Sequence, residues 1–339
     1  MQATLWLLWH AIIFLGAWTS FAHAFTNPIK TRDGSDPFIV YYDGMYYLTS
    51  TTWSNIVITA SPTIEGLKTA SPQVVWTDRN AARCCNVWAP EMHKVAGRWY
   101  IYYTAGPDVN DFVQRQRVWV LQGGTGDPLS AAYSFVSQIT PPNYSQGMLD
   151  ATVYNISGKS YFIYSSTVAP ASLYIAELLT PTTTGLATMI SRPELPWERQ
   201  GWSINEGPAG LTSPNGTHYV VFSASGCNTE HYKLGALKLS TGSDPLQASS
   251  WTKLPDPLFT TANGLHGPGH NAFFKSPDGT QDWNVYHANR SPSGGCDGGR
   301  QTFVQPVGWN SDDTPDLGAP MAPGTQIQPP SGEGPQTLR

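Results

Sequence analysis

Five short stretches of this sequence repeat one order of residue types, and this repeat constrains the fold most strongly. Each begins with a polar or acidic residue close to Pro, Gly or Ala and continues into an apolar run. A turn follows, and then a second run that is rich in aromatic and β-branched residues. The leading residues lie 55 to 64 positions apart and are Asp36, Glu91, Asp150, Glu206 and His270. Such runs are typical of strands, and no helical period of useful length accompanies them. Five units of nearly constant length predict an all-β, five-bladed β-propeller.

The geometry of a propeller gives these leading residues a shared place. The innermost strand of every blade lines the central axis, so residues at the same end of each inner strand face one cavity. A single Asp before Pro is usually a turn residue, but here acids recur at the same phase of four repeats. The recurrence predicts that carboxylates far apart in the sequence converge in a catalytic centre.

The composition agrees with a folded, aromatic-rich chain. The 339 residues include 13 Trp, 16 Tyr and 12 Phe, and the net charge is only −5. Disordered chains combine few aromatics with high charge, so that class is excluded. The sequence shows no basic stripe, which argues against a nucleic-acid partner.

The first 24 residues have the pattern of a secretory signal peptide. Residues 5–18 form an apolar core, and residues 22–24 read Ala-His-Ala, a small-x-small cleavage site. A membrane anchor is the alternative, but the apolar stretch is shorter than a span of about 20 residues. We therefore expect a secreted, extracellular protein with no membrane partner. The catalytic propeller is expected over 25–321 and a Pro- and Gly-rich tail over 322–339.

Export bears on the glycosylation and redox state of the chain. Four Asn-x-Ser/Thr sequons agree with a secreted protein, and they begin at Asn143, Asn155, Asn215 and Asn289. The four cysteines, which allow three disulfide connectivities, are Cys84, Cys85, Cys227 and Cys296. A bond between the adjacent Cys84 and Cys85 would leave Cys227 to pair with Cys296. Pairings across the chain are the alternative, and the sequence does not decide between them.

Opposed carboxyl groups in a cleft suit the hydrolysis of a glycosidic bond. One carboxyl, kept protonated, gives its proton to the leaving oxygen, and the other, ionised, activates water. A third carboxylate raises the pKa of the acid by repulsion between like charges. Asp36, Asp150 and Glu206 provide three such positions. Flat aromatic faces for sugar rings are expected from Trp53, Trp88 and Trp202.

Five motifs, in this order, resemble those of glycoside hydrolase family 43, and most closely those of its α-L-arabinofuranosidase members. The resemblance runs from about Asn27 to about Pro320 and is carried by "GSDPFIVYYDGMYYLTST", "VWAPEMHKVAGRWYIYYTA", "LDATVYNISGKSYFIYS", "NEGPAGLTSPNGTHYVVFSASG" and "GPGHNAFFKSPDGTQDWNVYHANRSP". It implies a five-bladed propeller and an inverting mechanism. It also implies that Asp36 is the general base, Glu206 the general acid, and Asp150 the residue that tunes pKa and orientation. An inverting pair implies carboxyl groups roughly 6.5–9.5 Å apart.

The resemblance implies roles for further residues. His270 matches a family histidine near the axis that helps to hold a calcium ion or ordered water, so a structural calcium bound through waters is expected there, with no cofactor required for the reaction. Arg300 lies where family members often place an Arg that touches the sugar. Apart from the resemblance, substrate contacts are expected from Trp88 and Trp53, and Glu91 is grouped with these substrate-binding residues in the same ring, with a structural or rim role. The pair Cys84-Cys85 departs from the family pattern, and its contact with substrate is a further hypothesis.

The resemblance implies a secreted, exo-acting enzyme that releases α-L-arabinofuranose from plant cell-wall arabinan or arabinoxylan. We expect it to be a monomer. The alternatives are a β-xylosidase, an endo-arabinanase or an exo-galactanase with the same centre, or an inactive propeller that only binds glycans. Residues 106–118 are a candidate rim loop. Repeats longer than 40–45 residues argue against a WD-type interaction propeller.

Overall fold

The structure is a computed structural model that describes residues 24–334. The predicted signal peptide lies outside the described residues except for its last position. No helix within residues 24–334 is long and apolar enough to cross a bilayer. Three of the sequon asparagines are exposed, whereas Asn289 is 6 % exposed and donates a hydrogen bond to the Gly295 carbonyl. That burial leaves no room for a glycan on Asn289.

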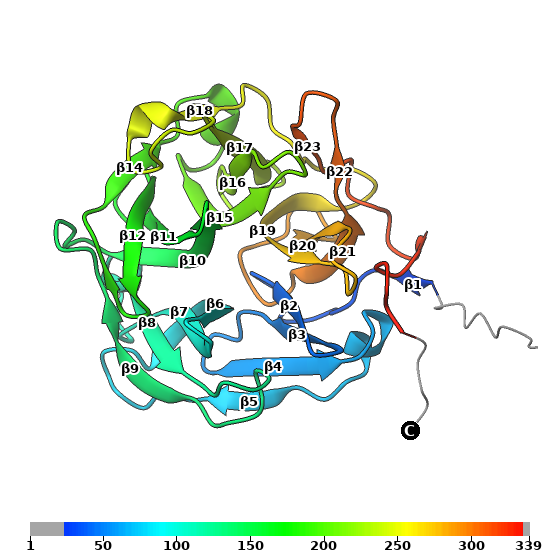
Figure 1. The fold of residues 1–339 in the computed structure, drawn as a ribbon, viewed down its shortest axis with the longest axis horizontal. Helices are drawn as coiled ribbons and strands as arrows, with labels where there is room; N and C mark the ends of the chain where they lie inside the picture. Colours follow the sequence, from blue (N-terminus) through cyan, green and yellow to red (C-terminus); the bar gives the residue numbers. More distant parts are fainter. Residues whose placement is uncertain (1–23, 335–339) are drawn as a thin grey trace, which may run out of the picture.

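The strands form five antiparallel sheets around one central axis, which confirms the predicted five-bladed β-propeller (Figure 1). Blade 1 contains β2 (Phe38–Tyr42), β3 (Met45–Thr49), β4 (Ile56–Ser61) and β5 (Gln73–Trp76). Blade 2 contains β6 (Cys85–Val95), β7 (Arg98–Gly106), β8 (Arg117–Gln122) and β9 (Ser134–Ile139). Blade 3 contains β10 (Met148–Ile156), β11 (Lys159–Ser166), β12 (Leu173–Thr180), β13 (Thr183–Thr184) and β14 (Thr188–Ser191).

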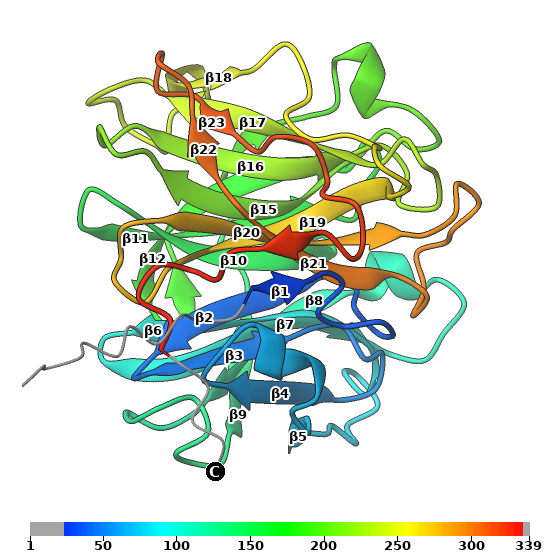
Figure 2. The same cartoon turned by 90° about the vertical axis from the view of Figure 1, so that its right-hand side faces the viewer.

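The remaining two blades complete the ring (Figure 1), and Figure 2 shows the propeller from the side. Blade 4 contains β15 (Asn205–Thr212), β16 (His218–Ala224), β17 (Lys233–Leu239) and β18 (Trp251–Lys253). Blade 5 contains β19 (His266–Lys275), β20 (Asp282–Asn289) and β21 (Gln301–Pro306). Outside the blades lie β22 (Gly308–Trp309), β23 (Pro315–Asp316) and four 3₁₀ turns, η1 (Glu65–Lys68), η2 (Phe112–Arg115), η3 (Pro196–Glu198) and η4 (Ala248–Ser250).

Tight two-residue turns join the first and second strands of three blades. Asp43-Gly44, Ala96-Gly97 and Ser157-Gly158 all have positive φ at both positions. A hairpin turn with two left-handed residues matches the twist of the strands that it joins. These turns therefore fix the register of the first and second strands, as in the pairing of Tyr42 with Met45.

The core consists of apolar clusters between neighbouring blades, because each sheet buries both of its faces. Blades 3 and 4 enclose Ile163, Phe222 and Leu237, and blades 4 and 5 enclose Val221, Phe259 and Tyr286. Other clusters fill the spaces between blades 2 and 3 and between blades 5, 1 and 2. This packing holds the inner strands rigidly at the axis.

The two ends of the described chain meet and close the ring. Asn27 binds blade 5 through both the amide and the carbonyl of Val304, at 3.0 and 2.7 Å. β1 (Phe25–Thr26) pairs with β24 (Gln326–Ile327). The tail then continues to Glu333, whose carboxylate accepts a hydrogen bond from the Ile64 amide. The described part of the tail is therefore tied to the N-terminal segment and to blade 1.

Candidate active site

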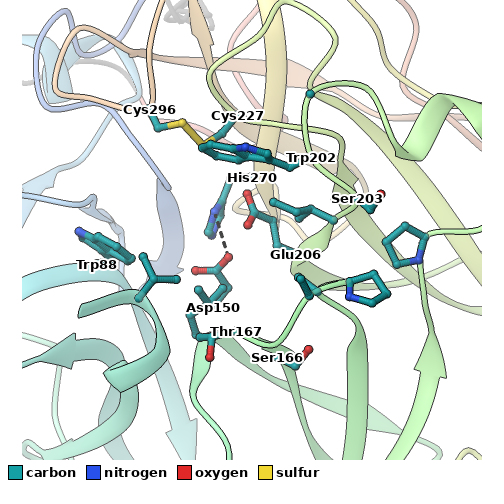
Figure 3. Close-up of a pocket in the computed structure, with 18 of the residues that line it drawn as sticks. Trp88, Asp150, Ser166, Thr167, Trp202, Ser203, Glu206, Cys227, His270 and Cys296 are labelled. Carbon is teal, nitrogen blue, oxygen red and sulfur yellow. Dashed lines mark ion pairs between the residues drawn. A yellow bond between two sulfur atoms is a disulfide. The ribbon is translucent and has the colours of Figure 1, made fainter. Parts of the chain in front are cut away.

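A cleft of about 1110 Å³ opens at one end of the propeller axis (Figure 3). It brings together most of the site residues expected from the sequence, namely Asp36, Asp150, Glu206, His270, Arg300, Trp53, Trp88 and Trp202. Each of the five blades except blade 2 supplies a polar group from the start of its inner strand. Residues separated by more than 230 positions therefore face one cavity.

A recurring backbone feature aims these side chains. Each blade has a left-handed residue at an equivalent place, within the inner strand or, in blade 1, just before it. These residues are Asp36, Ala89, Asp150, Gly207 and His270, with φ between 41° and 54°. In four blades this residue lies within a β-bulge. A bulge bends the strand and redirects the adjacent side chain, and strained left-handed residues cluster at functional sites.

Hydrogen bonds from the preceding blade hold most of these left-handed residues. The donor in each case is a backbone N–H and the acceptor is a hydroxyl near the end of the second strand: Ala89 binds Thr51 at 2.8 Å, Asp150 binds Thr104 at 3.1 Å, and His270 binds Ser223 at 2.7 Å. Gly207 differs because its N–H donates to Asp150 Oδ2 at 3.2 Å. Asp150 therefore orients the backbone directly beside Glu206.

Glu91 does not line this cleft, although the sequence pattern placed it among the substrate-binding residues. The left-handed residue of blade 2 is Ala89, so Glu91 lies two positions farther along the strand. There it borders a separate cavity of about 180 Å³ and pairs with His93 at 2.7 Å. The repeat spacing therefore misplaced the equivalent position of blade 2 by two residues, at Glu91 instead of Ala89.

Asp36 lies in a strongly cationic environment. Its Oδ1 is 3.2 Å from His270 Nδ1, 3.4 Å from His287 Nδ1 and 3.8 Å from Arg300 Nη1. Its Oδ2 accepts a hydrogen bond from the Thr51 hydroxyl at 2.6 Å. Burial alone would raise the pKa of Asp36, but His270, Arg300 and His287 outweigh burial and hold that pKa well below its usual range. Asp36 is therefore ionised at neutral pH.

The other two carboxyl groups have the opposite tendency. Burial raises the pKa of Asp150 to about 8, and the charges of Glu206 and Asp36 add to the rise while His270 opposes it. Burial also raises the pKa of Glu206, against the hydrogen bond that the Tyr232 hydroxyl donates to its Oε1 at 2.8 Å. These two carboxyl groups resist simultaneous ionisation, so the pair retains a proton that Asp36 does not hold.

His270 lies between the carboxylates, with Nδ1 3.8 Å from Asp150 Oδ2 as well as close to Asp36 (Figure 3). Burial lowers its pKa, but Asp36, Asp150 and Glu206 reverse the effect and leave the pKa raised. The raised pKa favours the protonated imidazole, which donates hydrogen bonds to the neighbouring carboxylates. Residues 24–334 also contain no cluster of three His, Cys, Asp or Glu side chains suited to a metal. A calcium ion held through water stays a prediction, and no step below depends on it.

Two residues that the sequence did not single out support the centre. His287 is fully buried, and its Nε2 accepts a hydrogen bond from Arg300 at 2.9 Å. Burial, together with Arg300, lowers the pKa of His287 to about 3, so it is neutral. The ring of Tyr232 stacks on His287 with centroids 5.8 Å apart. The sequence feature that could have pointed to His287 is its position on the second strand of blade 5. This position is equivalent to that of Ser223 on the second strand of blade 4.

Aromatic side chains form one wall of the cleft. Trp88 contacts both Trp53 and Phe112 edge to face, with centroids 5.9 and 5.8 Å apart. Phe112 comes from η2, within the loop expected at the rim. The cysteines form the pairs Cys84–Cys85 and Cys227–Cys296. The second pair lines the cleft, whereas the first is not among the lining residues.

A buried ion pair organises the loop that precedes Glu206. Glu198 is 0 % exposed and accepts hydrogen bonds from Lys253 Nζ at 2.7 Å and Asn205 Nδ2 at 2.9 Å. Its other oxygen accepts from two backbone N–H groups of its own loop. Because Asn205 adjoins Glu206, this cluster fixes the direction from which the carboxyl of Glu206 enters the cleft.

Glu198→Ala is expected to destabilise the protein by about 3–5 kcal/mol, because it leaves Lys253 uncompensated and several donors unsatisfied. Chemical denaturation followed by tryptophan fluorescence measures the change. The exposed neighbour provides the control, since Glu194→Ala should change the free energy of unfolding by less than about 0.5 kcal/mol. Equal effects of the two substitutions would contradict the organising role of Glu198.

The comparisons with known proteins agree with this site. The model of the family described as Glycosyl hydrolases family 43 matches residues 25–315, and the chain belongs to this family. An extracellular exo-α-(1→5)-L-arabinofuranosidase of Streptomyces avermitilis is 38 % identical over 88 % of this chain and 64 % of its own length. Alpha-L-arabinofuranosidase 43 of Humicola insolens is 37 % identical over 86 % of this chain and 62 % of its own length. The chain thus spans less than two thirds of these relatives.

Solved structures show the same architecture. The crystal structure of an α-L-arabinofuranosidase from Lactobacillus brevis superposes with a TM-score of 0.82 at 32 % identity, and covers 89 % of this chain and 98 % of its own. A thermostable family-43 glycoside hydrolase gives a TM-score of 0.72 at 21 % identity over 89 % and 98 % of the two chains. The second likeness concerns the fold alone.

Proposed function

We propose that the protein is a secreted, inverting, exo-acting α-L-arabinofuranosidase. The observation that carries the proposal is the contrast between an ionised Asp36, surrounded by cationic and donor groups, and a pair of carboxyl groups, Asp150 and Glu206, with raised pKa values. A matched base and acid in one cleft is the arrangement that direct displacement at a sugar carbon requires. A propeller that only binds glycans has no use for it.

In the proposed reaction, Asp36 removes a proton from water as the water oxygen bonds to the anomeric carbon. The bond from that carbon to the leaving oxygen breaks on the opposite face, and Glu206 gives its proton to this oxygen. Asp150 holds the Gly207 N–H and thereby aims Glu206. His270 and Arg300 keep Asp36 ionised before the step. Afterwards Asp36 is protonated and Glu206 is ionised, and exchange with solvent restores both.

The sugar and the location are proposed from the relatives. Four relatives that are 34–38 % identical are named arabinofuranosidases, and two of these names read extracellular exo-α-(1→5)-L-arabinofuranosidase. We therefore propose a plant cell-wall polysaccharide as substrate and arabinofuranose as the sugar released. Export agrees with the pattern of the first 24 residues and with two disulfides among the described residues. We propose a monomer that needs no cofactor for the reaction.

The test is to incubate the purified protein with 4-nitrophenyl α-L-arabinofuranoside and, separately, with the β-xyloside, and to follow the product by proton NMR. We expect release of the β-anomer of arabinofuranose from the first substrate alone. Initial release of the α-anomer would overturn inversion, and preference for the xyloside would overturn the sugar. No hydrolysis of either compound or of long arabinan would favour a glycan-binding protein.

A further inference from the structure

Trp202 stands out because it is 49 % exposed and lines the cleft. Every other strongly exposed large apolar side chain of residues 24–334 is a Val, Leu or Met. Trp202 precedes Glu206 by four residues. Figure 3 shows its ring beside the Cys227–Cys296 disulfide, on the side of the cleft where Glu206 lies and away from Trp88. An exposed aromatic face at a concave site is a candidate contact for a ligand.

The backbone beneath Trp202 is built to hold it in place. The carbonyl of Gln200 accepts a hydrogen bond from the Gly226 N–H at 2.8 Å, and the Gln200 N–H donates to the Ser225 hydroxyl at 3.0 Å. Gly201 has φ of 78°, a conformation that favours glycine. A Cβ on Gly226 would lie 3.3 Å from the backbone nitrogen of Trp202, so the two loops approach closely. This segment is seated on the loop after β16.

The Cys227–Cys296 disulfide links the loop under Trp202 to a loop on the opposite side of the catalytic pair. Cys227 belongs to the loop under Trp202, and Cys296 belongs to the loop after β20, 69 residues away. The next residue, Asp297, accepts a hydrogen bond through its carbonyl from the Ser35 hydroxyl at 3.0 Å. Ser35 directly precedes Asp36. A continuous wall therefore joins the loop that precedes Glu206 to the loop that carries Asp36.

The side of the cleft on which Trp202 lies determines its use. A general acid gives its proton to the oxygen of the leaving group, so the leaving group sits beside the acid. We infer that Trp202, supported by the Cys227–Cys296 disulfide, forms the subsite for the leaving-group sugar, whose apolar ring face stacks on the indole. The occupant is the next sugar residue of the polysaccharide. This inference rests on the proposed function, because it takes Glu206 as the acid.

The experiment compares two substrates that differ only in the leaving group: methyl α-L-arabinofuranoside, which offers no second ring, and (1→5)-linked arabinotriose. Trp202→Ala is expected to lower kcat/KM for the triose roughly 10-fold to 100-fold, as for the loss of one central aromatic contact. It should change kcat/KM for the methyl glycoside less than about twofold. Trp202→Phe should restore part of the loss, because it keeps a flat apolar face.

A second variant tests the support beneath the ring. Cys227→Ser/Cys296→Ser, assayed well below its melting temperature, is expected to lower kcat/KM for the triose several-fold with little change for the methyl glycoside, because Trp202 loses its fixed seat. Cys84→Ser/Cys85→Ser is the matched control, since that disulfide does not line the cleft. Leu186→Ala, at a 64 % exposed site outside the cleft, controls for Trp202→Ala. Both controls should leave the ratio of the two substrates unchanged.

Several outcomes would overturn the inference. Equal losses on both substrates would mean that Trp202 positions Glu206 and contacts no sugar, and no loss on either would mean that the ring is idle. Failure of the proposed function is distinct, because the wild type would then not cleave the methyl glycoside. If the wild type prefers xylosides, the same comparison with methyl β-xyloside and xylotriose tests the subsite. If it cleaves none of these compounds, both proposals fall.

Discussion

Glu206→Gln is expected to lower kcat on arabino-oligosaccharides by about 10²–10⁴-fold, the contribution of a positioned general acid. Glutamine has the same shape and can still accept the hydrogen bond from Tyr232, so the fold should persist. What disappears is the proton for the leaving oxygen. A leaving group such as dinitrophenolate departs without that proton, so the loss on a dinitrophenyl glycoside should be much smaller. Steady-state kinetics on both substrates measure the difference.

The pH profile gives a second measure of the same role. Because the pKa of Glu206 is raised, its carboxyl group stays protonated to a higher pH than an ordinary glutamate, and activity should fall only as pH rises through that pKa. Glu206→Gln should remove this basic limb. Glu177→Gln, which alters a partly exposed glutamate near Lys159, is the control and should leave rate and profile unchanged. A lower melting temperature with unchanged kcat would assign Glu206 a structural role instead.

The blades could be predicted from the sequence because each one repeats a complete local signal. Hairpins such as that of Tyr42 and Met45 are fixed by a two-residue turn, and residue types that favour the left-handed conformation mark such a turn in the sequence. The aromatic second strand begins directly after the turn. The convergence of Asp36, Asp150 and Glu206 then follows from the symmetry of a propeller. Local pattern and repeat length together determine this part of the site.

What the sequence did not reveal depends on contacts between blades. Glu91 does not reach the cleft because the equivalent left-handed position of blade 2 is Ala89, two residues earlier, and an apolar residue there gives no signal among polar leading residues. His287 and Tyr232 act through hydrogen bonds and stacking with residues from other blades. The Cys227–Cys296 bond likewise joins loops whose proximity exists only in the folded ring.

Asp36→Asn is expected to lower kcat by about 10³–10⁴-fold on every substrate, at the upper end for a positioned base. Asparagine cannot take a proton from water, and a good leaving group does not replace that function, so the loss should be as large on a dinitrophenyl glycoside as on an oligosaccharide. Asparagine tolerates the left-handed backbone at φ of 53°, so the substitution tests chemistry more than conformation. Steady-state kinetics on the two substrates measure the loss.

The loss of the Asp36 carboxylate should also affect His270 and Arg300, because it balances their charges. Without Asp36 one of the charges that raise the pKa of His270 is gone, so His270 should lose its proton at a lower pH in an NMR titration. The matched control is Asp43→Asn, the same change at a left-handed but exposed hairpin turn, where rate and titration should not move. If Asp36→Asn spares the dinitrophenyl glycoside while Glu206→Gln does not, the two carboxyl groups have exchanged roles, because only the acid is dispensable when the leaving group needs no proton.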